Sequence, residues 1–492
     1  MKGRIGVLNS RKRFKQVILT VVVLILTFSI VLSLPQSIKT SKIQKIATNT
    51  LNSNTQKTIA RGADDVIWDK TYGGVEDDFA YCVKKTTDGG FIITGFTESF
   101  STGGKDVWLI KTDENGDKEW EKTFGGIEDD VGYWVEIAYD GGYIIVGYTR
   151  SYGAGEDDLW LIKTDAFGNE EWNKIFGGLF EWSYERGYYV VQTTDVGYII
   201  LGYTGIITSY SIWLIKTDEN GTIQCNKTYS LGWTNIGYCI QQTTDGGYII
   251  AGFIKDYDEP RGGHCLIKTD ENFNKQWGNM YADWVRFDER GSWVEQTNDG
   301  GYILVGGNEP HKSYTESTDV WLIKTNSNGD YEWKKTFGGE GYDNGYFIDN
   351  TTDGGYIIIG RTSSYGAGSD DIWLIKTDEN GDKEWDKTYG GKSSDKGLCG
   401  VQITDKEYII MGNTESYGAG STDVWLLKVS IEDNGLVNRV FGDDYVVIFI
   451  ALGALVLLAA LLVKYFNLRM IRKQTEQPKK EEEWEGVFFK DK

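Results

Sequence analysis

The chain has 492 residues, of which 40% are hydrophobic and 25% are charged, with 62 glycines, 18 tryptophans, 30 tyrosines and only four prolines. This composition is typical of a folded chain with a large core, and it excludes collagen, extended disorder and a polytopic transporter. The formal net charge is −21. Residues 1–63 carry an excess of eleven basic groups and residues 464–492 an excess of two, so the residues between them carry −34. Such an acidic body repels nucleic acid and favours basic or cationic partners.

The N-terminal part contains an uncharged run, Val17–Leu34, behind a basic segment, residues 1–16. This pattern is typical of a signal anchor or of a cleaved signal peptide, and the sequence leaves the two open. Residues 35–63 are polar and rich in Ser, Thr and Asn, which indicates a flexible linker.

Residues 64–430 contain an internal repeat. The string Trp-Leu-Ile-Lys, or a close variant, recurs at intervals of 52 to 56 residues. Its seven copies begin at Trp108, Trp160, Trp213, Cys265, Trp321, Trp373 and Trp425. An Asp-Gly-Gly motif, intact or altered, also precedes an apolar run in every repeat. A period of this length indicates a repeat architecture.

Each repeat predicts four short strands. In the first repeat, Phe79–Thr86 and Phe91–Thr97 flank an Asp-Gly-Gly turn, and Asp106–Thr112 and Asp117–Phe124 flank a Glu-Asn-Gly turn. Gly and Asn-Gly supply the left-handed backbone that tight hairpins need. Four antiparallel strands repeated seven times, without helical periodicity, predict an all-β fold: a seven-bladed β-propeller of four-stranded antiparallel blades. A solenoid is the alternative, because repeat architectures resemble one another in sequence.

The repeats are staggered against the ends of this domain. The outer-strand motif first occurs at Val66–Tyr72, before any other strand, and the last repeat ends at Trp425–Val429. We expect these two segments to pair and close the ring, because closure removes open strand edges. A faint further copy, Asn434–Gly442, is the alternative closing strand. Closure by Val66–Tyr72 places both chain ends on the side of the Asp-Gly-Gly turns, with the opposite loops pointing away from a membrane.

The C-terminal part contains a juxtamembrane linker, residues 431–444, then a second uncharged run, Tyr445–Val463, and a tail, residues 464–492. Both uncharged runs are long enough to cross a bilayer as helices. Basic residues flank the two runs at their outer ends, so the positive-inside rule predicts an N-terminal and a C-terminal transmembrane helix, cytosolic termini and an extracellular propeller. Cleavage of the first run would leave a single-span protein.

The strings WLIKTDENGDKEW, residues 108–120, and DGGYIIVGYT, residues 140–149, resemble the propeller repeats of prokaryotic cell-surface proteins of the quinoprotein-like or kelch-like superfamily. The resemblance covers residues 66–430 and implies the fold alone, because propellers have many functions. The chain lacks the Cys-Cys pair that the quinoprotein resemblance implies at a cofactor. No catalytic residue is carried over from either family.

Residues shared by every repeat are explained by the fold, so we expect function where the repeats diverge. The loops entering the third to fifth repeats carry tryptophans outside the repeat positions, together with two acids. The predicted ligand-binding residues are Trp182, Trp233, Trp284, Asp283 and Asp288. Exposed indoles would stack on sugar rings or anchor a protein partner. The alternative is that they cover the rims of the blades.

Loops of the fourth and fifth repeats also carry both histidines of the chain, next to several carboxylates. These are ligand types for divalent cations, so a calcium-like ion is the only cofactor that we consider. The candidate ligands are His264, His311, Asp256, Asp258 and Glu309. Solvated surface charge is the alternative.

The five cysteines fall into two groups. Cys225 and Cys265 each replace a repeat tryptophan in neighbouring repeats and form a candidate disulfide. Cys82, Cys239 and Cys399 share one position of the first strand, where other repeats have aromatic residues, and we interpret them as buried fillers.

Taken together, these features predict a membrane-anchored extracellular binding module for a protein, a glycan or a cation. The sequence shows no nucleophile–base pair and no cofactor fingerprint, so we do not expect an enzyme. Two alternatives stay open. One is a structural envelope protein without a specific ligand, and the other is a surface glycoside-active enzyme that uses paired carboxylates.

Overall fold

The chain divides into two compact units, Met1–Ile59 and Ala60–Lys492. The computed structural model describes residues 65–178, 182–206, 209–255, 262–281, 293–308 and 317–431, all in the second unit. These ranges contain 28 strands and no helix, which confirms the all-β class. None of their elements is therefore an apolar helix of membrane-spanning length. The predicted membrane segments, Val17–Leu34 and Tyr445–Val463, lie outside the described residues.

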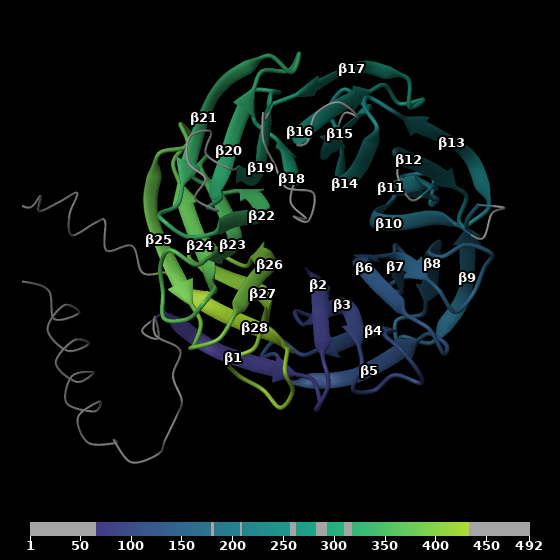
Figure 1. Cartoon of the computed structure of the whole chain (residues 1–492), viewed down its shortest axis with the longest axis horizontal. Coiled ribbons are helices and arrows are strands. Elements are labelled where there is room, and N and C mark those ends of the chain that lie inside the picture. The colour runs from purple at the N-terminus through teal and green to yellow at the C-terminus, as the bar shows by residue number, and fades with distance from the viewer. Residues whose placement is uncertain are drawn as a thin grey trace, which may run out of the picture. The chain divides into compact units, whose positions relative to one another are not determined.

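The strands occupy four radial positions around a common axis (Figure 1). The inner strands are β2 (Asp78–Lys85), β6 (Asp130–Ile137), β10 (Ser183–Gln192), β14 (Thr234–Gln242), β18 (Trp293–Gln296), β22 (Asp343–Asn350) and β26 (Asp395–Gln402). The second strands are β3 (Phe91–Thr97), β7 (Tyr143–Thr149), β11 (Tyr198–Ile206), β15 (Tyr248–Lys255), β19 (Tyr302–Asn308), β23 (Tyr356–Thr362) and β27 (Glu407–Thr414). The third strands are β4 (Asp106–Thr112), β8 (Asp158–Thr164), β12 (Ser209–Thr217), β16 (Gly262–Thr269), β20 (Asp319–Thr325), β24 (Asp371–Thr377) and β28 (Asp423–Ser430). The outer strands are β5 (Lys118–Phe124), β9 (Glu170–Phe176), β13 (Ile223–Tyr229), β17 (Lys275–Met280), β21 (Tyr331–Phe337), β25 (Lys383–Tyr389) and β1 (Val66–Tyr72).

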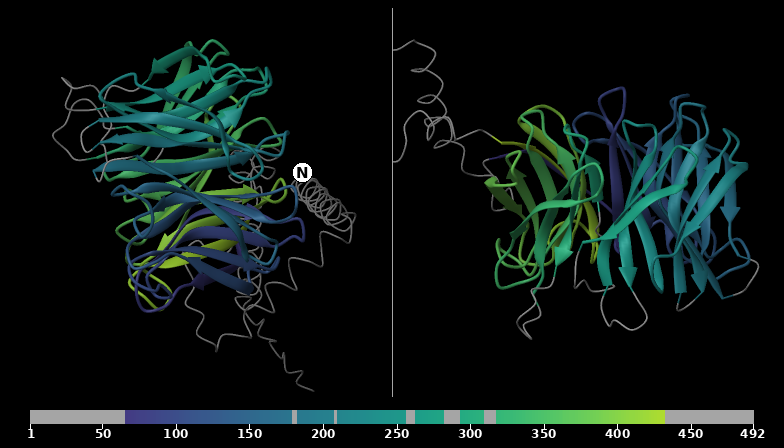
Figure 2. Two further views of the ribbon diagram at one scale, coloured as in Figure 1. Left: turned by 90° about the vertical axis from the view of Figure 1, so that its right-hand side faces the viewer. Right: turned by 90° about the horizontal axis from the view of Figure 1, so that it is seen from above.

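The strands form antiparallel meanders, as in a β-propeller. Five sheets have four strands each, in orders such as β2-β3-β4-β5 and β6-β7-β8-β9. The strands β10 to β17 form one sheet of eight, in which a parallel pair, Tyr210 opposite Thr234, joins β12 to β14. Figure 2 shows the strands from the side, running between two faces that carry the connections.

One face, called the turn face here, carries the tight hairpin turns. Gly89 and Gly116 have φ values of 91° and 74°, which only glycine adopts without strain. The Asp113 carboxylate accepts hydrogen bonds from the backbone nitrogens of Asn115 and Asp117, both at 2.8 Å. The Asp-x-Asn-x-Asp spacing therefore caps a hairpin turn.

The opposite face, called the loop face here, carries the longer connections. Asp78 holds one of them: its carboxylate accepts hydrogen bonds from the hydroxyls of Thr97 and Ser99 and from the backbone nitrogen of Gly74. The same aspartate clasp recurs at the start of β6, β22 and β26, whereas β10 has Glu185 at this place. Since this carboxylate holds the connection in place, the change from Asp to Glu in β10 is a structural difference, and so part of the sequence divergence among the loops reflects the fold.

The core lies between the sheets. Every residue of β3, β4, β7, β8 and β24 is buried. This explains why their sequences are apolar without alternation, since both faces of each sheet are covered by neighbouring sheets.

The predicted closure is confirmed. β1 pairs antiparallel with β28, with Lys70 opposite Leu426, and so completes the last sheet in the order β1-β28-β27-β26. The Trp425 indole also donates a hydrogen bond of 3.2 Å to the Asp69 carboxylate. Figure 1 shows β1 lying along the outer side of β28. The alternative segment, Asn434–Gly442, lies outside the described residues, and β1 already occupies this edge of β28.

Candidate functional site

A bulge recurs near the loop face in the inner strands. In β2 the register shifts between Ala80 and Cys82, so one residue is inserted there, and β6, β10, β14, β22 and β26 have the same shift. Bulges re-aim a side chain relative to the regular alternation. In four consecutive repeats the inserted residue is a tyrosine, and these tyrosines face one another around the axis.

We call these residues, Tyr81, Tyr133, Tyr188 and Tyr238, the tyrosine arc. The ring centroids of neighbouring members lie 5.2, 4.8 and 5.2 Å apart in chain order. Tyr133 is buried, and the other three are half-buried. The arc therefore presents partly exposed aromatic rings from β2, β10 and β14, with the buried Tyr133 of β6 between them.

A second layer of tyrosines supports the arc. Tyr148 packs against Tyr133 at 5.8 Å, and Tyr203 packs against Tyr188 at 6.0 Å. Burial, together with neighbouring tyrosines, raises the pKa values of Tyr148 and Tyr203 well above that of a free phenol. Both phenols are therefore neutral near pH 7, and their O–H groups are hydrogen-bond donors.

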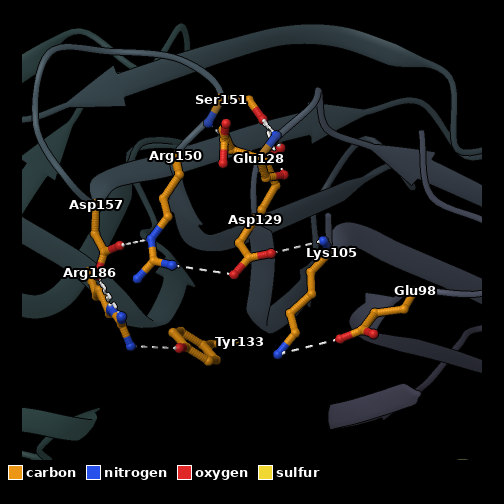
Figure 3. Close-up of polar contacts among 10 residues, drawn as sticks. Glu98, Lys105, Glu128, Asp129, Tyr133, Arg150, Ser151, Asp157 and Arg186 are labelled. Atoms are coloured by element: carbon orange, nitrogen blue, oxygen red, sulfur yellow. Dashed lines mark hydrogen bonds and ion pairs between the residues drawn. The ribbon is translucent and has the colours of Figure 1, made fainter. Parts of the chain in front are cut away.

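An arginine beside the arc is held by a buried carboxylate (Figure 3). The Arg186 guanidinium donates from Nε, at 2.6 Å, and from Nη2, at 2.5 Å, to Asp157, whose side chain is fully buried. Its Nη1 donates to the Tyr133 hydroxyl at 3.3 Å, and its guanidinium carbon lies 4.3 Å from the centre of the Tyr148 ring. Arg186 is thus fixed in position against the tyrosines.

The same carboxylate connects to the neighbouring loops. Arg150 donates to Asp157 at 2.6 Å and to Asp129 at 3.3 Å. The other Asp129 oxygen accepts the backbone N–H of Lys105 at 3.1 Å, and the Lys105 ammonium lies 3.7 Å from Glu98 (Figure 3). These contacts link the loop-face connections of the first three repeats and preorganise the rim around the arc.

At the residue after the bulge, and at the equivalent Trp293 of β18, four aromatic rings fill the axis and form what we call the aromatic plug. Trp134 stacks on Tyr189 at 4.3 Å and contacts Trp293 at 5.1 Å, and Trp293 contacts Phe347 at 4.8 Å. The three remaining repeats have cysteine at this position, as the sequence indicated, and all three cysteines are buried. The plug separates the arc from the other end of the axis.

Two residues further along the inner strands, polar side chains gather at the turn-face end of the axis. The Lys84 ammonium pairs with Glu136 at 3.1 Å and lies 4.6 Å from the centre of the Trp134 ring. Glu295 accepts hydrogen bonds from the amide of Gln241 and from its neighbour Trp293. We call the equivalent residues Lys84, Glu136, Gln241, Glu295 and Asp349 the axial polar group.

Burial dominates the electrostatics of this group. It raises the pKa of Glu295 to about 7, and the nearby Asp349 carboxylate adds to the shift. Burial also raises the pKa of Asp349 itself. Among the described residues, no set of three or more His, Cys, Asp or Glu side chains has a geometry that would hold a metal ion.

The predicted aromatic anchors lie elsewhere on the loop face. Trp182, just before β10, is 56% exposed, and Trp233, just before β14, is 40% exposed. Both are therefore surface residues, in contrast to the repeat tryptophan Trp160, which is 3% exposed. Other predicted site residues, Trp284, Asp283, Asp288, His311, Asp256, Asp258 and Glu309, lie outside the described residues.

The predicted metal ligand His264 is not on a loop. It lies within β16, 3% exposed, and its Nε2 hydrogen-bonds the carbonyl oxygen of Gly307 at 2.9 Å. Burial lowers the pKa of His264 to about 4, so the imidazole is neutral. Its place in the core, rather than on the surface, is a correction to the sequence-based placement.

The candidate disulfide is also corrected. Cys225 is exposed on β13, opposite Lys216, whereas Cys265 is fully buried on β16, opposite Gly252 and Met280. Both thiols are free.

Sequence reasoning missed the tyrosine arc and the axial polar group, because in the first strands it compared only the position of the cysteines and sought function in the loops. A signal was available: the residue at the place of Lys84 is Glu136, Val191, Gln241, Glu295, Asp349 or Val401 in the other repeats. The tyrosine position is almost uniform by comparison, so comparing repeats would not have marked it.

Comparison with known proteins leaves the family open. No family model matches the chain, and no curated protein matches it. A polysaccharide lyase, Uly1, is 12% identical, with 73% of this chain and 92% of that chain covered and a TM-score of 0.47. BBS1N, solved in complex with ARL6DN, is 8% identical over 75% and 97% of the two chains, with a TM-score of 0.43. A protein of unknown function from Dyadobacter fermentans DSM 18053 is 11% identical over 75% and 99%, with a TM-score of 0.42. Likeness at this level transfers no activity to this chain.

Proposed function

We propose that the chain is a membrane-anchored β-propeller of seven blades that binds a glycan outside the cell through the tyrosine arc. The blade number counts the sheet of β10 to β17 as two blades, because a single parallel pair joins its two meanders. It agrees with the seven sequence repeats.

The observation that carries the proposal is the arc with its fixed arginine. Tyrosine rings offer an apolar face to the C–H groups of a sugar, and their hydroxyls offer polar contacts at the edge. Binding sites of this kind combine aromatic walls with a few well-placed polar groups. Arg186, held by Asp157 and Tyr133, supplies one such group without needing to reorder on binding.

The test is glycan binding by the full chain in detergent, first on an array and then by calorimetry with the best oligosaccharide. Tyr188→Ala should weaken binding by about 30-fold, the effect of removing an anchor worth ~2 kcal/mol. Tyr346→Ala is the matched control, because Tyr346 is the bulge residue of β22, outside the arc. Equal losses in the two variants, or no glycan binding at all, would count against the proposal.

A protein partner is the second candidate, and exposed apolar residues on the loop face favour it. Val75 and Ile127, at equivalent places before β2 and β6, are 76% and 78% exposed, and Trp182 and Trp233 extend this set to the third and fourth repeats. Replacing both tryptophans with alanine should then abolish the binding of a protein partner and leave glycan binding unchanged. Loss of glycan binding with unchanged binding of the protein partner would instead place the glycan on the two tryptophans.

Membrane anchoring rests on the two uncharged runs and their basic flanks. Protease added outside intact cells should digest the propeller and leave epitope tags at both termini protected. Loss of the N-terminal tag during maturation would show that Val17–Leu34 is cleaved, and digestion of the C-terminal tag would contradict the topology.

An enzyme that hydrolyses the bound glycan is the remaining alternative. The aromatic plug lies between the arc and the carboxylates of the axial polar group, so those carboxylates do not face a sugar bound at the arc. Incubation of a bound oligosaccharide with the protein should therefore release no new reducing ends, and release that is lost in Glu295→Gln would favour the enzyme.

A further inference from the structure

The first and the last inner strands, β2 and β26, are neighbours in the ring (Figure 1). Their sheets come from opposite ends of the domain, and hydrogen bonds join them: the Ala80 backbone exchanges two with the Asn413 side chain, at 2.8 and 3.1 Å. Any covalent link at this place would connect the two ends of the propeller directly.

Two cysteines meet at this seam. Cys82, on β2, is fully buried, and Cys399, on β26, is 2% exposed. The Cys399 sulfur lies 3.8 Å from the carbonyl oxygen of Val83, the residue next to Cys82. The Cys82 sulfur itself lies 3.7 Å from the carbonyl oxygen of Val135 in the next repeat. The two cysteines therefore occupy neighbouring positions of the seam, and turning the Cys82 side chain from Val135 towards Cys399 would bring the two sulfurs together.

The third cysteine at this position shows that the pairing is specific to the seam. Cys239, on β14, is buried in the same way, with its sulfur 3.8 Å from the Val294 carbonyl oxygen. Its neighbours at the same level of the axis are Tyr189 and Trp293. Around the ring, the last and first repeats are the neighbouring pair that both carry cysteine.

We propose that Cys82 and Cys399 form a disulfide that links the first repeat covalently to the last and stabilises the closed ring. The reaction needs an oxidant, which is an external disulfide such as oxidised glutathione or a disulfide oxidoreductase. Secreted and cell-surface proteins meet such oxidants, whereas cytosolic thiols stay reduced.

The chemistry is thiol–disulfide exchange. The Cys399 sulfur, as thiolate, attacks one sulfur of the external disulfide, forms a mixed disulfide and releases the other half as a thiolate that takes up the Cys399 proton. The Cys82 sulfur then attacks Cys399, and the second half leaves as a thiol with the Cys82 proton. Two protein thiols and one external disulfide thus give one protein disulfide and two external thiols.

The surroundings suit these roles. The neighbouring Cys82 thiol, aided by the nearby Lys84 ammonium, lowers the pKa of Cys399, and burial raises the pKa of Cys82. Because both thiols are buried in the closed ring, the exchange takes place as the ring closes, and the finished bond is shielded from reductants.

The test compares thiol counts of the full chain refolded in detergent with oxidised or with reduced glutathione. After denaturation without reductant, alkylation should label three of the five cysteines in the oxidised sample and all five in the reduced one. Peptide mapping should find Cys82 joined to Cys399. The oxidised protein should also unfold at a higher temperature than the reduced protein.

Matched variants make the result specific. Cys239→Ala should keep the redox-dependent shift in unfolding temperature, whereas Cys82→Ala and Cys399→Ala should lose it. Five labelled cysteines in the oxidised wild type, or a disulfide between other cysteines, would overturn the proposal. Because the peptide map uses the wild type, this outcome does not depend on the variants folding.

Discussion

The aromatic plug gives a stability prediction that can be worked out from its contacts. We consider Trp134→Ala. The Trp134 side chain is 4% exposed, stacks on Tyr189 at 4.3 Å, contacts Trp293 at 5.1 Å and lies under the Lys84 ammonium. Its removal leaves a cavity on the axis, because the backbone of the surrounding inner strands is fixed by their sheets.

The expected loss is about 4–5 kcal/mol in the free energy of unfolding. Replacing a buried Trp or Phe with alanine costs roughly 3–5 kcal/mol through lost burial and the residual cavity. Each aromatic pair adds about 0.5–1.5 kcal/mol beyond burial, which places Trp134 in the upper part of that range. Trp134→Phe should cost about 1 kcal/mol, because it keeps most of the ring volume. The indole N–H adds little to this cost, since it has no hydrogen-bond partner among the described residues.

The assay is urea unfolding of the full chain in detergent, followed by circular dichroism. Trp182→Ala is the control, since a 56% exposed tryptophan should change stability by only about 0.5 kcal/mol. Equal destabilisation by Trp134→Ala and Trp182→Ala would refute the reasoning, because it would mean that the axial position is not a packed core site.

Three further predictions concern pH, closure and the rim. The pKa of Glu295 is raised by burial from 4.5 to about 7, so the folded chain holds a proton that the unfolded chain releases, and stability should fall as pH rises from about 4.5 to about 7. Glu295→Gln should remove this fall, which amounts to ~3 kcal/mol in the wild type by pH 7, in unfolding curves measured at several pH values. Deleting Val66–Tyr72 exposes the edge of β28, and size-exclusion chromatography should then show oligomers or aggregate in place of the wild-type species. Asp157→Ala removes a fully buried carboxylate that holds two arginines, and it should destabilise the chain by about 3 kcal/mol and weaken glycan binding, whereas an unchanged unfolding midpoint would contradict the structural role of this contact.

The fold could be predicted from the sequence because every repeat carries the same pattern of strands and turns. The run Tyr143–Val146 is apolar without alternation and is buried in β7 between neighbouring sheets. Val66–Tyr72 carries an outer-strand motif before any inner strand, and it completes the last sheet. In both places the local sequence pattern determines the structure around the strand. A strand that is apolar on both faces has to lie between two other sheets, and an outer strand without its own blade has to pair with the open edge of another blade.

His264 shows where the sequence could have been used better. It directly precedes the altered repeat motif at Cys265, at the place that Val107, Leu159 and Val424 occupy in other repeats. Those three residues are buried strand positions, and so is His264. Alignment of the repeats thus predicts a core histidine, whereas grouping residues by loop and by ligand type suggested a metal site.

The tyrosine arc could not be predicted in the same way. The inner-strand bulge inserts one residue, and a one-residue insertion reverses which face the following side chains occupy. From the sequence alone, Tyr133 and Trp134 are two adjacent aromatic residues, of which alternation would put one in the core. The structure places Tyr133 in the arc and Trp134 in the plug, so both belong to the axis.

Sequence differences between the repeats are therefore of two kinds: those that packing explains and those that it does not. Only the second kind indicates function. In the plug, the variation conserves volume: four aromatic rings already fill the axis, and the remaining repeats carry the small Cys82, Cys239 and Cys399, so packing accounts for the small size of these three residues. In the axial polar group, the variation conserves neither volume nor charge, and it buries Glu295, whose pKa is raised to about 7, near Lys84. Burying ionisable groups opposes stability, and a packed fold does not require it. Variation that lowers stability without improving packing is explained by selection for function. In the described part of the chain, such variation lies on the axis rather than at the rim.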